Sequence, residues 1–296
     1  MTTYCGYIAI IGRPNVGKST LLNKILHLKL SITSNKPQTT RHKILGIVTQ
    51  DQHQFVYVDT PGIHPDNQKT LNQFMNKTAR SVLLDVDIIV FVIDSSIWHE
   101  NDEHVLQILT TMNLPVILAI NKIDKIKNKT QLLPLIAKLS QRYNFTDIVP
   151  ISAKNGTQID QLQKILKSFL PPSPLLFDTD QFTDRSTRFL CAELLREKIF
   201  RLCGEELPYA TDVLIELFKE EAQLISINAL ILVEKSGHKR IIIGTNGDKL
   251  KEIASTARID MEKLLNKKIY LRCWCKIKSG WSNDALLLKQ LGYEDH

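Results

Sequence analysis

The chain has 296 residues, 43% of them apolar, and a formal net charge of +7. This length and composition are typical of a globular protein with about two domains. They argue against a membrane-spanning protein, because the longest apolar runs, "VDIIVFVI" and "LPVILAI", fall well short of the roughly 20 residues that cross a bilayer. The N-terminus also lacks the charged region of a signal peptide, so we expect a cytoplasmic protein.

The cysteine pattern argues against disulfides and zinc. The five cysteines, an odd number, stand at positions 5, 191, 203, 273 and 275 and form no CxxC pair, which is typical of reduced cytosolic thiols. Cys273 and Cys275 alternate in "YLRCWCKI", so we expect them to share one face of a strand rather than to form a site.

Short β-branched runs alternate with helical patterns from residue 6 to about 170. The runs "YIAIIG", "VDIIVFVID", "PVILAI" and "DIVPIS" are followed by helical patterns at 17–28, 100–111, 130–143 and 156–169. Continuous apolar strands separated by helices predict a parallel sheet with both faces covered. The pair "ILGIVTQ" and "QFVYVD", separated by "DQH", predicts a hairpin and one antiparallel edge. Residues 1–170 are therefore expected to form a doubly wound, mostly parallel α/β domain.

A phosphate-binding loop is predicted after the first strand. The stretch "GRPNVGKST" at 12–20 fits GxxxxGK(S/T) and lies between an apolar strand and a helix, as the mechanism requires. Gly12 and Gly17 let the backbone wrap a β-phosphate at the positive end of the helix dipole. Lys18 reaches the β- and γ-phosphates, and Ser19 offers a hydroxyl to magnesium.

The motif "DTPG" at 59–62 closes the strand "FVYVD". The carboxyl ends of parallel strands form the crevice in which such folds bind ligands. Asp59 is therefore placed for a magnesium-bound water, and the Gly62 N–H for the γ-phosphate. The alternative is that Asp59 only ends a strand.

Two further strand ends predict recognition of guanine. In "NKID" at 121–124, the Asp124 carboxylate can accept the ring N–H and the exocyclic NH₂ of guanine, a donor pair that adenine lacks. Asn121 can bond the base, and the stem of Lys122 can lie over it. In "ISAKNG", the Ala153 N–H comes near the guanine carbonyl, and its two neighbours brace the loop. Together these motifs favour GTP over ATP.

Three prolines in "LPPSPLLFD" end the last helix and predict a linker over 171–183. A second domain, residues 184–296, is expected to contain a helix near 185–203, strands near 211–219 and 225–235, a helix reaching about 265, a strand over 268–277 and a short helix from about 284. Most of the excess basic charge lies here, because residues 235–278 hold 12 Lys and Arg against 4 Asp and Glu. This favours binding to nucleic acid or an anionic membrane; the alternative is a solvated helix face.

"GTNG" at 244–247 lies inside this basic segment and opens a helical stretch. Two glycines three residues apart let backbone N–H groups approach a negative ligand. The pattern alone is expected about once by chance in a chain of this length, so its meaning depends on the rest of the sequence.

Together these motifs resemble the Era family of bacterial GTPases across essentially the whole chain. The resemblance rests on "GRPNVGKST", "SITSNKPQTTRHKI", "DTPG", "NKID" and "ISAKNG" in the first half, and on "NALILVEKSG", "IIIGTNGDKLK" and "KSGWSNDALLLKQLGY" in the second. It implies an α/β P-loop GTPase domain followed by an α+β KH domain of type II that grips single-stranded RNA.

The resemblance also implies an activity and partners. These are hydrolysis of GTP to GDP with Mg²⁺, binding of the 3′ end of 16S rRNA by the GTP form and its release by the GDP form, and assistance in assembly of the small ribosomal subunit. A monomer, cytoplasmic with a peripheral inner-membrane fraction, is expected.

Individual residues receive roles in the same way. The resemblance makes "QTTRH" at 38–42 the first switch, with Thr40 rather than Thr39 as magnesium ligand. From the residues alone, this loop is a candidate lid or an ordinary Thr-rich turn. The expected catalytic residues are Lys18, Thr40 and Gly62, and the expected metal ligands are Ser19, Thr40 and Asp59. The expected nucleotide-binding residues are Gly12, Asn15, Val16, Gly17, Lys18, Ser19, Thr20, Asp59, Gly62, Asn121, Lys122, Asp124, Ser152, Ala153 and Lys154.

Ile63 stands where Ras-like enzymes carry a glutamine that orients the attacking water. Isoleucine cannot bond water, so hydrolysis is expected to be slow unless another group or ion stabilises the transition state. Related GTPases use an asparagine at the position of Asn15 to help bind potassium beside the phosphates, where an arginine finger acts elsewhere. We therefore hypothesise a potassium (K⁺) site at Asn15; the alternative is an asparagine that only shapes the loop.

In the second domain, the resemblance identifies Gly244 and Gly247 as the KH loop pair. Thr245 and Asn246 between them are neutral, whereas many KH loops carry Lys or Arg there, so a weaker clamp is expected. The expected RNA-binding residues are these four together with Lys239, Arg240, Lys249 and Lys251. Ile241 to Ile243 are candidates for the RNA groove or for the core, and Trp281 for base stacking or for packing.

Two other functions stay open from sequence alone. One is a GTPase recruited to a membrane by its basic segment, and the other is a nonspecific nucleic-acid chaperone that uses GTP only for stability. A GxxG pair at a helix mouth favours RNA over lipid, because a lipid-binding patch needs only charge and apolar surface.

Overall fold

The computed structural model describes residues 2–34, 36, 39–62, 70–204 and 207–293. Their contacts form two compact units. The first comprises Met1–Thr33, Thr40–Asn67 and Met75–Asp184, and the second comprises Ser34–Thr39, Gln68–Phe74 and Arg185–His296. Each unit has its own sheet and its own hydrophobic core.

The first unit is built on a six-stranded sheet in the order β2-β3-β1-β4-β5-β6. β2 pairs antiparallel with β3, and the other neighbouring strands are parallel, which confirms the predicted hairpin at the edge of a mostly parallel sheet. The strand order reverses around β1, so the loops after β1 and its neighbours meet at the ligand-binding crevice of this fold. The strands are β1 (Tyr4–Ile11), β2 (Ile44–Gln50), β3 (His53–Asp59), β4 (Ile88–Asp94), β5 (Val116–Asn121) and β6 (Asp147–Pro150).

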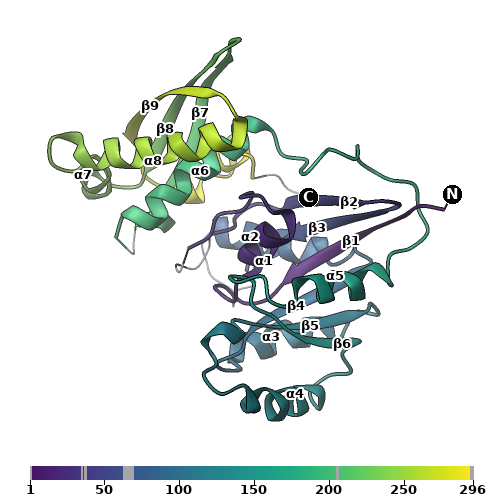
Figure 1. Ribbon diagram of the computed structural model, residues 1–296. Helices are drawn as coiled ribbons and strands as arrows, with labels where there is room; N and C mark the ends of the chain where they lie inside the picture. The colour runs from purple at the N-terminus through teal and green to yellow at the C-terminus, as the bar shows by residue number, and fades with distance from the viewer. Residues whose placement is uncertain (1, 35, 37–38, 63–69, 205–206, 294–296) are drawn as a thin grey trace. The chain divides into compact units, whose positions relative to one another are not determined.

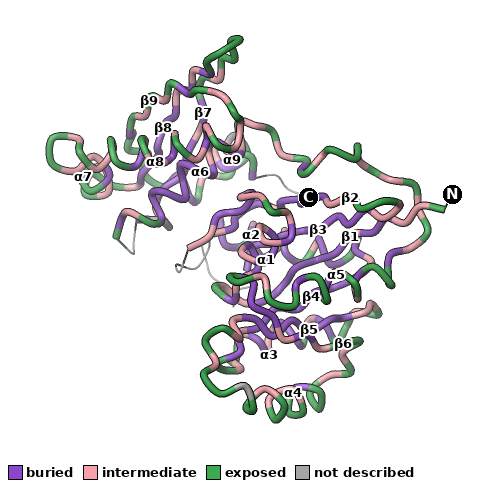
Figure 2. Tube along the Cα trace, in the orientation of Figure 1, coloured by how far each residue is buried: buried purple, intermediate pink, exposed green. Residues whose placement is uncertain are grey.

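Helices cover both faces of this sheet (Figure 1). They are α1 (Lys18–Leu26), α2 (Thr70–Val82), α3 (Glu100–Leu109), α4 (Leu132–Ser140) and α5 (Ile159–Lys167). Ala79 of α2, Val105 of α3 and Leu139 of α4 join the core on one face, whereas α1 and α5 lie on the other (Figure 1). Strands buried from both sides explain the continuous β-branched runs of the sequence, and Figure 2 shows them as the buried centre of the unit.

Helix α2 corrects the expectation from sequence, which contained no helix over residues 70–82. Its buried apolar side chains, Leu71, Met75, Ala79 and Val82, recur every three or four residues, which is the spacing of one helix face. Polar residues separate them, so no continuous apolar run marks the helix in the sequence.

The proline-rich segment after α5 belongs to the first unit. It begins beside the N-terminal strand, where the Cys5 N–H donates to Pro171 O at 3.2 Å. Farther on, the fully buried side chain of Gln54 in β3 donates to Phe177 O at 2.8 Å. The same side chain accepts from the N–H groups of Leu176 and Phe177 at 2.8 and 3.0 Å. The residues expected to form a linker, 171–183, are therefore attached to the first unit by backbone and side-chain bonds.

The second unit contains a three-stranded sheet in the order β7-β8-β9. β8 pairs antiparallel with β7 and parallel with β9. Its elements are α6 (Thr187–Leu202), β7 (Thr211–Glu220), β8 (Leu224–Val233), α7 (Ser236–Ile243), α8 (Asp248–Leu265), β9 (Lys268–Ile277) and α9 (Ala285–Gln290). The elements follow the order expected from the sequence. Helix α7 is an addition, because the sequence indicated only an apolar run at its C-terminal end. Short 3₁₀ helices occupy Ile123–Lys125, Lys129–Gln131, Leu207–Ala210, Thr245–Gly247 and Trp281–Asn283.

Helices α6 and α8 cover one face of the second sheet. Cys191 of α6 and Ala257 of α8 belong to one buried cluster with Cys275 of β9, and Cys273 packs against that cluster. Cys273 and Cys275 therefore share the core face of their strand, as their alternation predicts.

The C-terminal segment covers one end of the opposite face. Tyr293 Oη donates to Asp212 Oδ2 at 2.7 Å, and the indole N–H of Trp281 donates to Ala210 O at 3.2 Å. Trp281 is fully buried, and Leu230 of β8 is buried too. Trp281 therefore packs inside this unit, which was the alternative to base stacking.

Replacing Gln54 by alanine is expected to release the segment around Leu176 and Phe177. The Gln54 carbonyl accepts both backbone N–H groups, and a buried group that loses such a bond costs about 1–3 kcal/mol. This corresponds to a rise of about tenfold or more in the rate of amide hydrogen exchange. Exchange measured by mass spectrometry on peptides around residue 176 tests this expectation.

Gln50→Ala is the matched control, because it makes the same change at an exposed position of the adjacent strand. It should leave exchange of the segment unchanged. Equal exchange in the two variants would mean that the Gln54 side chain does not hold the segment in place.

Candidate functional site

The loop between β1 and α1 requires glycine at both ends. Gly12 has a φ of +148°, and a Cβ there would lie 2.3 Å from Val92 O. Gly17 has a φ of +104°, and a Cβ there would lie 2.3 Å from Asn121 Nδ2. Gly17 directly precedes Lys18, where α1 begins, so the free N–H groups of the first helical turn face the loop.

Lys18 lies within the loop that it helps to form. Its side chain is buried, and its ammonium donates to Gly12 O at 2.9 Å and to Arg13 O at 3.1 Å. Burial lowers the pKa of Lys18 to about 8, and the nearby Asp59 carboxylate opposes this shift. Phosphate oxygens favour the charged ammonium, so the loop and Lys18 together suit a polyphosphate.

Three oxygen-bearing side chains meet beside Lys18. Ser19 Oγ donates to Asp59 Oδ2 at 2.8 Å and lies 2.8 Å from Thr40 Oγ1. Thr40 Oγ1 also donates to Asp59 Oδ2 at 3.3 Å. Because Asp59 is the last residue of β3, the sheet itself fixes the carboxylate. The three residues expected to bind the metal thus lie within hydrogen-bonding distance of one another.

This cluster fits a magnesium ion. Mg²⁺ prefers oxygen ligands and is held by a few protein groups together with substrate phosphates. Asp59 is fully buried, and its Oδ1 has no hydrogen-bond partner among the described residues. Burial raises the pKa of Asp59, whereas the Lys18 charge and the hydroxyl groups of Ser19, Ser31 and Thr40 oppose that rise. A divalent cation would satisfy the remaining oxygen and stabilise the ionised carboxylate.

The Asn121 side chain ties the phosphate-binding loop to two other loops. Its Nδ2 donates to Val16 O at 2.8 Å. Its Oδ1 accepts from the N–H groups of Lys122 at 2.7 Å and Ala153 at 2.9 Å. Asn121 was expected to bond the base, and the Ala153 N–H to lie near the guanine carbonyl, but here the two groups bond each other. Asn121 therefore acts on the site by holding three loops in register.

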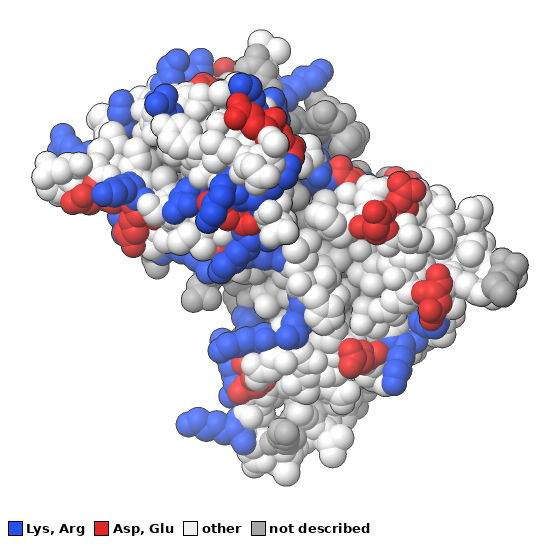
Figure 3. Space-filling model, turned by 45° about the horizontal axis from the view of Figure 1, so that its top comes forward, with Lys and Arg blue, Asp and Glu red and all other residues white. Residues whose placement is uncertain are grey.

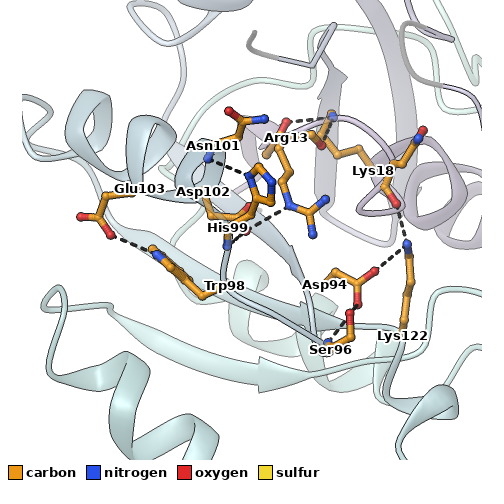
Figure 4. A network of polar contacts seen from close by, with 12 residues as sticks. Arg13, Lys18, Asp94, Ser96, Trp98, His99, Asn101, Asp102, Glu103 and Lys122 are labelled. Carbon is orange, nitrogen blue, oxygen red and sulfur yellow. Dashed lines mark hydrogen bonds and ion pairs between the residues drawn. The ribbon is translucent and has the colours of Figure 1, made fainter. Parts of the chain in front are cut away.

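A second set of polar contacts surrounds the loop (Figure 4). The Lys122 ammonium lies 2.8 Å from Asp94 Oδ2 and donates to Asn15 O at 2.6 Å. Burial alone would raise the pKa of Asp94, but its bonds with Lys122 and Ser96 lower it to about 2. Asn15 has a left-handed φ of +64°, and the bond to its carbonyl holds this conformation in place.

Arg13 anchors the same loop to α3. Its Nε donates to Asp102 Oδ2 at 3.1 Å, and Asp102 also accepts from the His99 N–H at 3.0 Å at the start of the helix (Figure 4). Arg13, Asp94 and Asp102 were not among the expected site residues. For Asp94 a signal was available, because it ends a buried strand just as Asp59 does.

Asp124 lies at the exposed side of the site and is held by Ser152. Ser152 Oγ donates to Asp124 Oδ1 at 2.6 Å and accepts from the Asn155 N–H at 3.2 Å. Thr20 and Lys154 line an adjoining hollow of about 450 Å³. That volume lies within the range of small-ligand pockets, so these loops leave room for a base and its sugar.

Gly62 approaches the phosphate-binding loop closely. A Cβ there would lie 2.9 Å from Pro14 Cγ, so only glycine fits without a shift. Ile63 and Gln38 lie outside the described residues. The position of Ile63 in place of a water-orienting glutamine therefore stays a prediction. The same holds for the start of the expected first switch at Gln38.

The residue before Thr40 belongs to the second unit. Thr39 O accepts from Arg196 Nη2 at 2.6 Å. Arg196 is buried in α6, where its Nε lies 2.7 Å from Glu193 Oε1 in an ion pair. One peptide bond thus joins a carbonyl held by the second unit to the hydroxyl of Thr40 in the metal-ligand cluster.

In the second unit, the GTNG loop makes a tight bend between α7 and α8. Gly244, Asn246 and Gly247 have φ values of +73°, +51° and +83°. A Cβ at Gly244 would lie 2.6 Å from Lys249 Cβ, whereas one at Gly247 would meet nothing within 4 Å. Packing therefore requires Gly244, and Gly247 faces open space. Thr245 and Asn246 are exposed between them.

The basic residues expected near this loop differ in availability. Arg240 and Lys251 are exposed, and Lys239 is half-buried. The Lys249 ammonium lies 2.9 Å from Glu252 Oε2 on the same helix, and this bond raises the pKa of Lys249. A phosphate would reach Lys249 only in competition with that carboxylate.

The apolar run before the loop forms the last turn of α7. Ile242 is fully buried in the core of the unit, whereas Ile241 is 52% exposed. Ile242 therefore belongs to the core, and Ile241 stays a candidate for contact with a ligand of the loop.

Comparison with known proteins agrees with this geometry. Residues 7–122 match the family of 50S ribosome-binding GTPases, and residues 206–282 match the KH domain. The GTPase Era of Pseudomonas aeruginosa is 53% identical over 291 residues, covering 98% of this chain and 95% of its own. The GTPase Era of Coxiella burnetii is 51% identical over 293 residues, covering 99% of both chains.

Solved structures match across both units. A crystal structure of Era in complex with MgGDPNP and nucleotides 1506–1542 of 16S ribosomal RNA has a TM-score of 0.95 and 39% identity, covering 98% of this chain and 99% of its own. A variant of Aquifex aeolicus Era bound to GDP.AlF4- gives the same values. The expected P-loop GTPase domain followed by a KH domain is thus confirmed, and this chain belongs to the Era family of GTPases.

Proposed function

We propose that this protein is a GTP-driven switch that binds the 3′ end of 16S rRNA through its KH domain and assists assembly of the small ribosomal subunit. One observation carries the proposal: the chain combines a phosphate site flanked by guanine-selective groups with a glycine loop that opens onto a basic surface. The Era structure with MgGDPNP and nucleotides 1506–1542 of 16S rRNA supports this pair of ligands, since it aligns with 98% of the chain.

The nucleotide would use groups that are already positioned. The N–H groups of the loop and the Lys18 ammonium neutralise the β- and γ-phosphates. Ser19, Thr40 and, through a metal-bound water, Asp59 would hold magnesium, which would supply further neutralisation of phosphate charge. Asp124, held by Ser152, accepts two N–H groups from guanine, and adenine cannot supply that pair.

Hydrolysis needs a substitute for the missing glutamine. Ile63 offers no polar atom to the attacking water. We propose that a potassium ion stabilises the charge that develops between the β- and γ-phosphates, with Asn15 among its ligands. The left-handed backbone of Asn15 and the Lys122 bond to its carbonyl support this role, because both fix the residue beside the phosphate loop.

Coupling between nucleotide and RNA would pass through Thr39 and Thr40. Thr40 would hold a nucleotide-bound metal through its hydroxyl, and loss of the γ-phosphate would weaken that contact. Thr39, one residue earlier, is bonded to the buried Arg196 of α6 in the KH-containing unit. A change at Thr40 would therefore be transmitted to α6 through one peptide bond.

The proposal includes a monomer with a peripheral fraction at the inner membrane. No helix within the described part of the chain is long and apolar enough to cross a membrane. Peripheral association would depend on the basic surface of the second unit and would weaken at high salt.

Nucleotide binding is expected to take up protons above pH 8. Burial places the pKa of Lys18 at about 8 in the free protein, so Lys18 is mostly neutral at about pH 9, whereas bound phosphates favour its charged form. The affinity for GDP should therefore fall by up to about tenfold per pH unit above 8. Calorimetry in two buffers with different ionisation enthalpies measures the uptake.

Guanosine is the matched control, because it lacks phosphates and reports only the protons that the guanine ring takes up at this pH. The additional uptake with GDP belongs to the phosphate site. Equal proton uptake with GDP and with guanosine at about pH 9 would contradict the assignment of Lys18 as a buried, partly neutral amine.

Gly247→Asp is expected to abolish RNA binding, with affinity at least about 100-fold weaker, and to leave GTP hydrolysis without RNA unchanged. The added carboxylate would point into the open space where phosphates approach the loop. Filter binding with a fragment of the 3′ end of 16S rRNA measures the loss.

Gly247→Ala is the matched control. Alanine and aspartate strain the left-handed backbone of residue 247 alike, but only aspartate adds a charge. It should weaken binding only a few-fold. RNA affinity unchanged in Gly247→Asp would remove the loop from the RNA site.

Single-turnover GTP hydrolysis should be about tenfold or more faster in potassium than in sodium. The effect should stay below the roughly 100-fold lost with a whole charge-stabilising group, because sodium keeps part of the charge. The Asn15→Ala variant should hydrolyse GTP at the same rate in potassium and in sodium. Asn144→Ala, an exposed asparagine of the same unit, should keep the difference between the two salts. Equal rates in the two salts for the unmodified protein would exclude the potassium site.

A further inference from the structure

The outward face of β9 carries basic and aromatic side chains that the sites above do not use. Alternate residues of a strand point to the same face of a sheet. Ile269, Leu271, Cys273 and Cys275 pack with the core cluster, so the residues between them face the other way. We call these outward residues the β9 stripe: Lys268, Tyr270, Arg272, Trp274 and Lys276.

The stripe exposes two aromatic rings. Tyr270 is 49% exposed and Trp274 is 38% exposed. The Arg272 guanidinium lies 5.3 Å from the centre of the Tyr270 ring, and its Nε donates to Tyr270 Oη at 2.8 Å. The phenol and the guanidinium are thus held together as one cationic surface. Exposed aromatic groups of this kind mark binding surfaces more often than single apolar residues do.

The neighbouring strand adds polar groups without charge. Across the parallel pairing, Ser226 lies beside Tyr270 and Asn228 lies beside Arg272. Leu230, beside Trp274, is buried, and the C-terminal segment covers that end of the face. The stripe therefore borders an open patch with hydrogen-bonding groups.

Positive charge dominates the stripe. In the part of the chain that the structure describes, Arg272 and Lys276 have no ion pair, and Lys268 lies 3.9 Å from Glu262 with 81% of its side chain exposed. Glu220, on β7, is occupied by Lys267 at 2.5 Å. Lys and Arg side chains gather on the surface of the second unit, at the upper left of Figure 3.

We propose that the β9 stripe is a second contact surface for single-stranded RNA, on the sheet face opposite to the helices and separate from the GTNG loop. Its basic groups would neutralise backbone phosphates, and Tyr270 and Trp274 would stack on bases. These rings lie four residues apart, about 13 Å along the strand. Sheets with exposed aromatic residues bind RNA in this way in other folds.

This inference rests on the proposed RNA-binding function and extends it. A KH loop grips about four nucleotides, so only a longer RNA would reach both surfaces. The stripe would therefore contribute to the affinity for long single strands and not for short ones.

Two other roles fit part of the observations. Lysine and arginine on an edge strand discourage pairing with another chain, but that role needs no aromatic side chain. Basic and aromatic groups together also attract anionic membranes, but peripheral insertion uses a broad apolar face, whereas charged side chains separate the two rings of the stripe. RNA accounts for both the charge and the rings.

Two single-stranded RNAs, of about 5 and about 15 nucleotides, test the proposal on the full chain. The double variant Tyr270→Ala/Trp274→Ala should bind the long RNA about tenfold or more weakly, the scale of lost stacking on two bases. It should bind the short RNA like the unmodified protein, which also shows that the unit is folded. Phe169→Ala, an exposed aromatic residue of the first unit, is the matched control and should bind both RNAs normally.

Two further measurements address stacking and charge. The long RNA should protect exposed tryptophan from iodide quenching. Trp274→Leu should remove this protection, since Trp281 is fully buried and the half-buried Trp98 lies in the first unit. For long-RNA binding, Lys276→Ala should reduce the slope of log affinity against log salt concentration by about one, the value for one lost phosphate contact. Trp274→Phe keeps a ring and should retain most of the affinity.

The outcomes separate the two claims. Normal binding of both RNAs by Gly247→Asp would contradict the proposed KH function itself. If Gly247→Asp loses both RNAs while the double variant binds the long RNA normally, only the stripe proposal is overturned. If the double variant no longer binds phosphatidylglycerol vesicles but keeps its RNA affinity, the stripe is a membrane contact. If the double variant dimerises and keeps its RNA affinity, the stripe protects the edge of the sheet from pairing.

Discussion

A buried carboxylate sets the requirements of the nucleotide site. Asp59 is held at the end of β3, and Ser19 and Thr40 donate to one of its oxygens at 2.8 and 3.3 Å. The other oxygen has no partner among the described residues, although the side chain is fully buried. The Lys18 charge and the hydroxyl groups compensate this buried carboxylate only in part, so the cluster suits a cation. The phosphate loop beside it supplies the remaining ligands by binding a nucleotide.

The proposed coupling between nucleotide and RNA would begin at the same cluster. Thr40 contributes its hydroxyl to the cluster, and Thr39 gives its carbonyl to Arg196 in the KH-containing unit. Arg196 cannot move freely, because it is buried and paired with Glu193. Thr39 is thus bonded to a rigid group, and Thr40 would bind a metal whose ligands depend on the nucleotide. A two-state switch needs these two elements.

Much of the fold follows from local sequence features. Strands buried on both faces require β-branched runs, and the bend before Lys18 requires Gly17, so the sheet and the phosphate loop could be predicted. Helix α2 was missed although its buried apolar residues recur at the spacing of one helix face, because polar residues separate them and no continuous apolar run marks it.

The details of the site depend on residues far apart in the chain. Asn121 bonds Val16 and Ala153, and Arg13 bonds Asp102, across separations that no motif records. Short motifs place side chains at the correct edge of the sheet, but they do not show whether a side chain contacts the ligand or another loop. The β9 alternation likewise predicted a shared face for its cysteines, but which face lies open depends on where α6 and α8 pack.

The affinity of the full chain for the 3′ end of 16S rRNA, measured with a non-hydrolysable GTP analogue and with GDP, tests the central claim most directly. Occupancy of the site by the GTP analogue should tighten RNA binding by about tenfold or more, within the usual range of coupling between sites. The corresponding adenine nucleotides should have no effect. Equal RNA affinities with the GTP analogue and GDP, or an equal response to adenine nucleotides, would contradict the account.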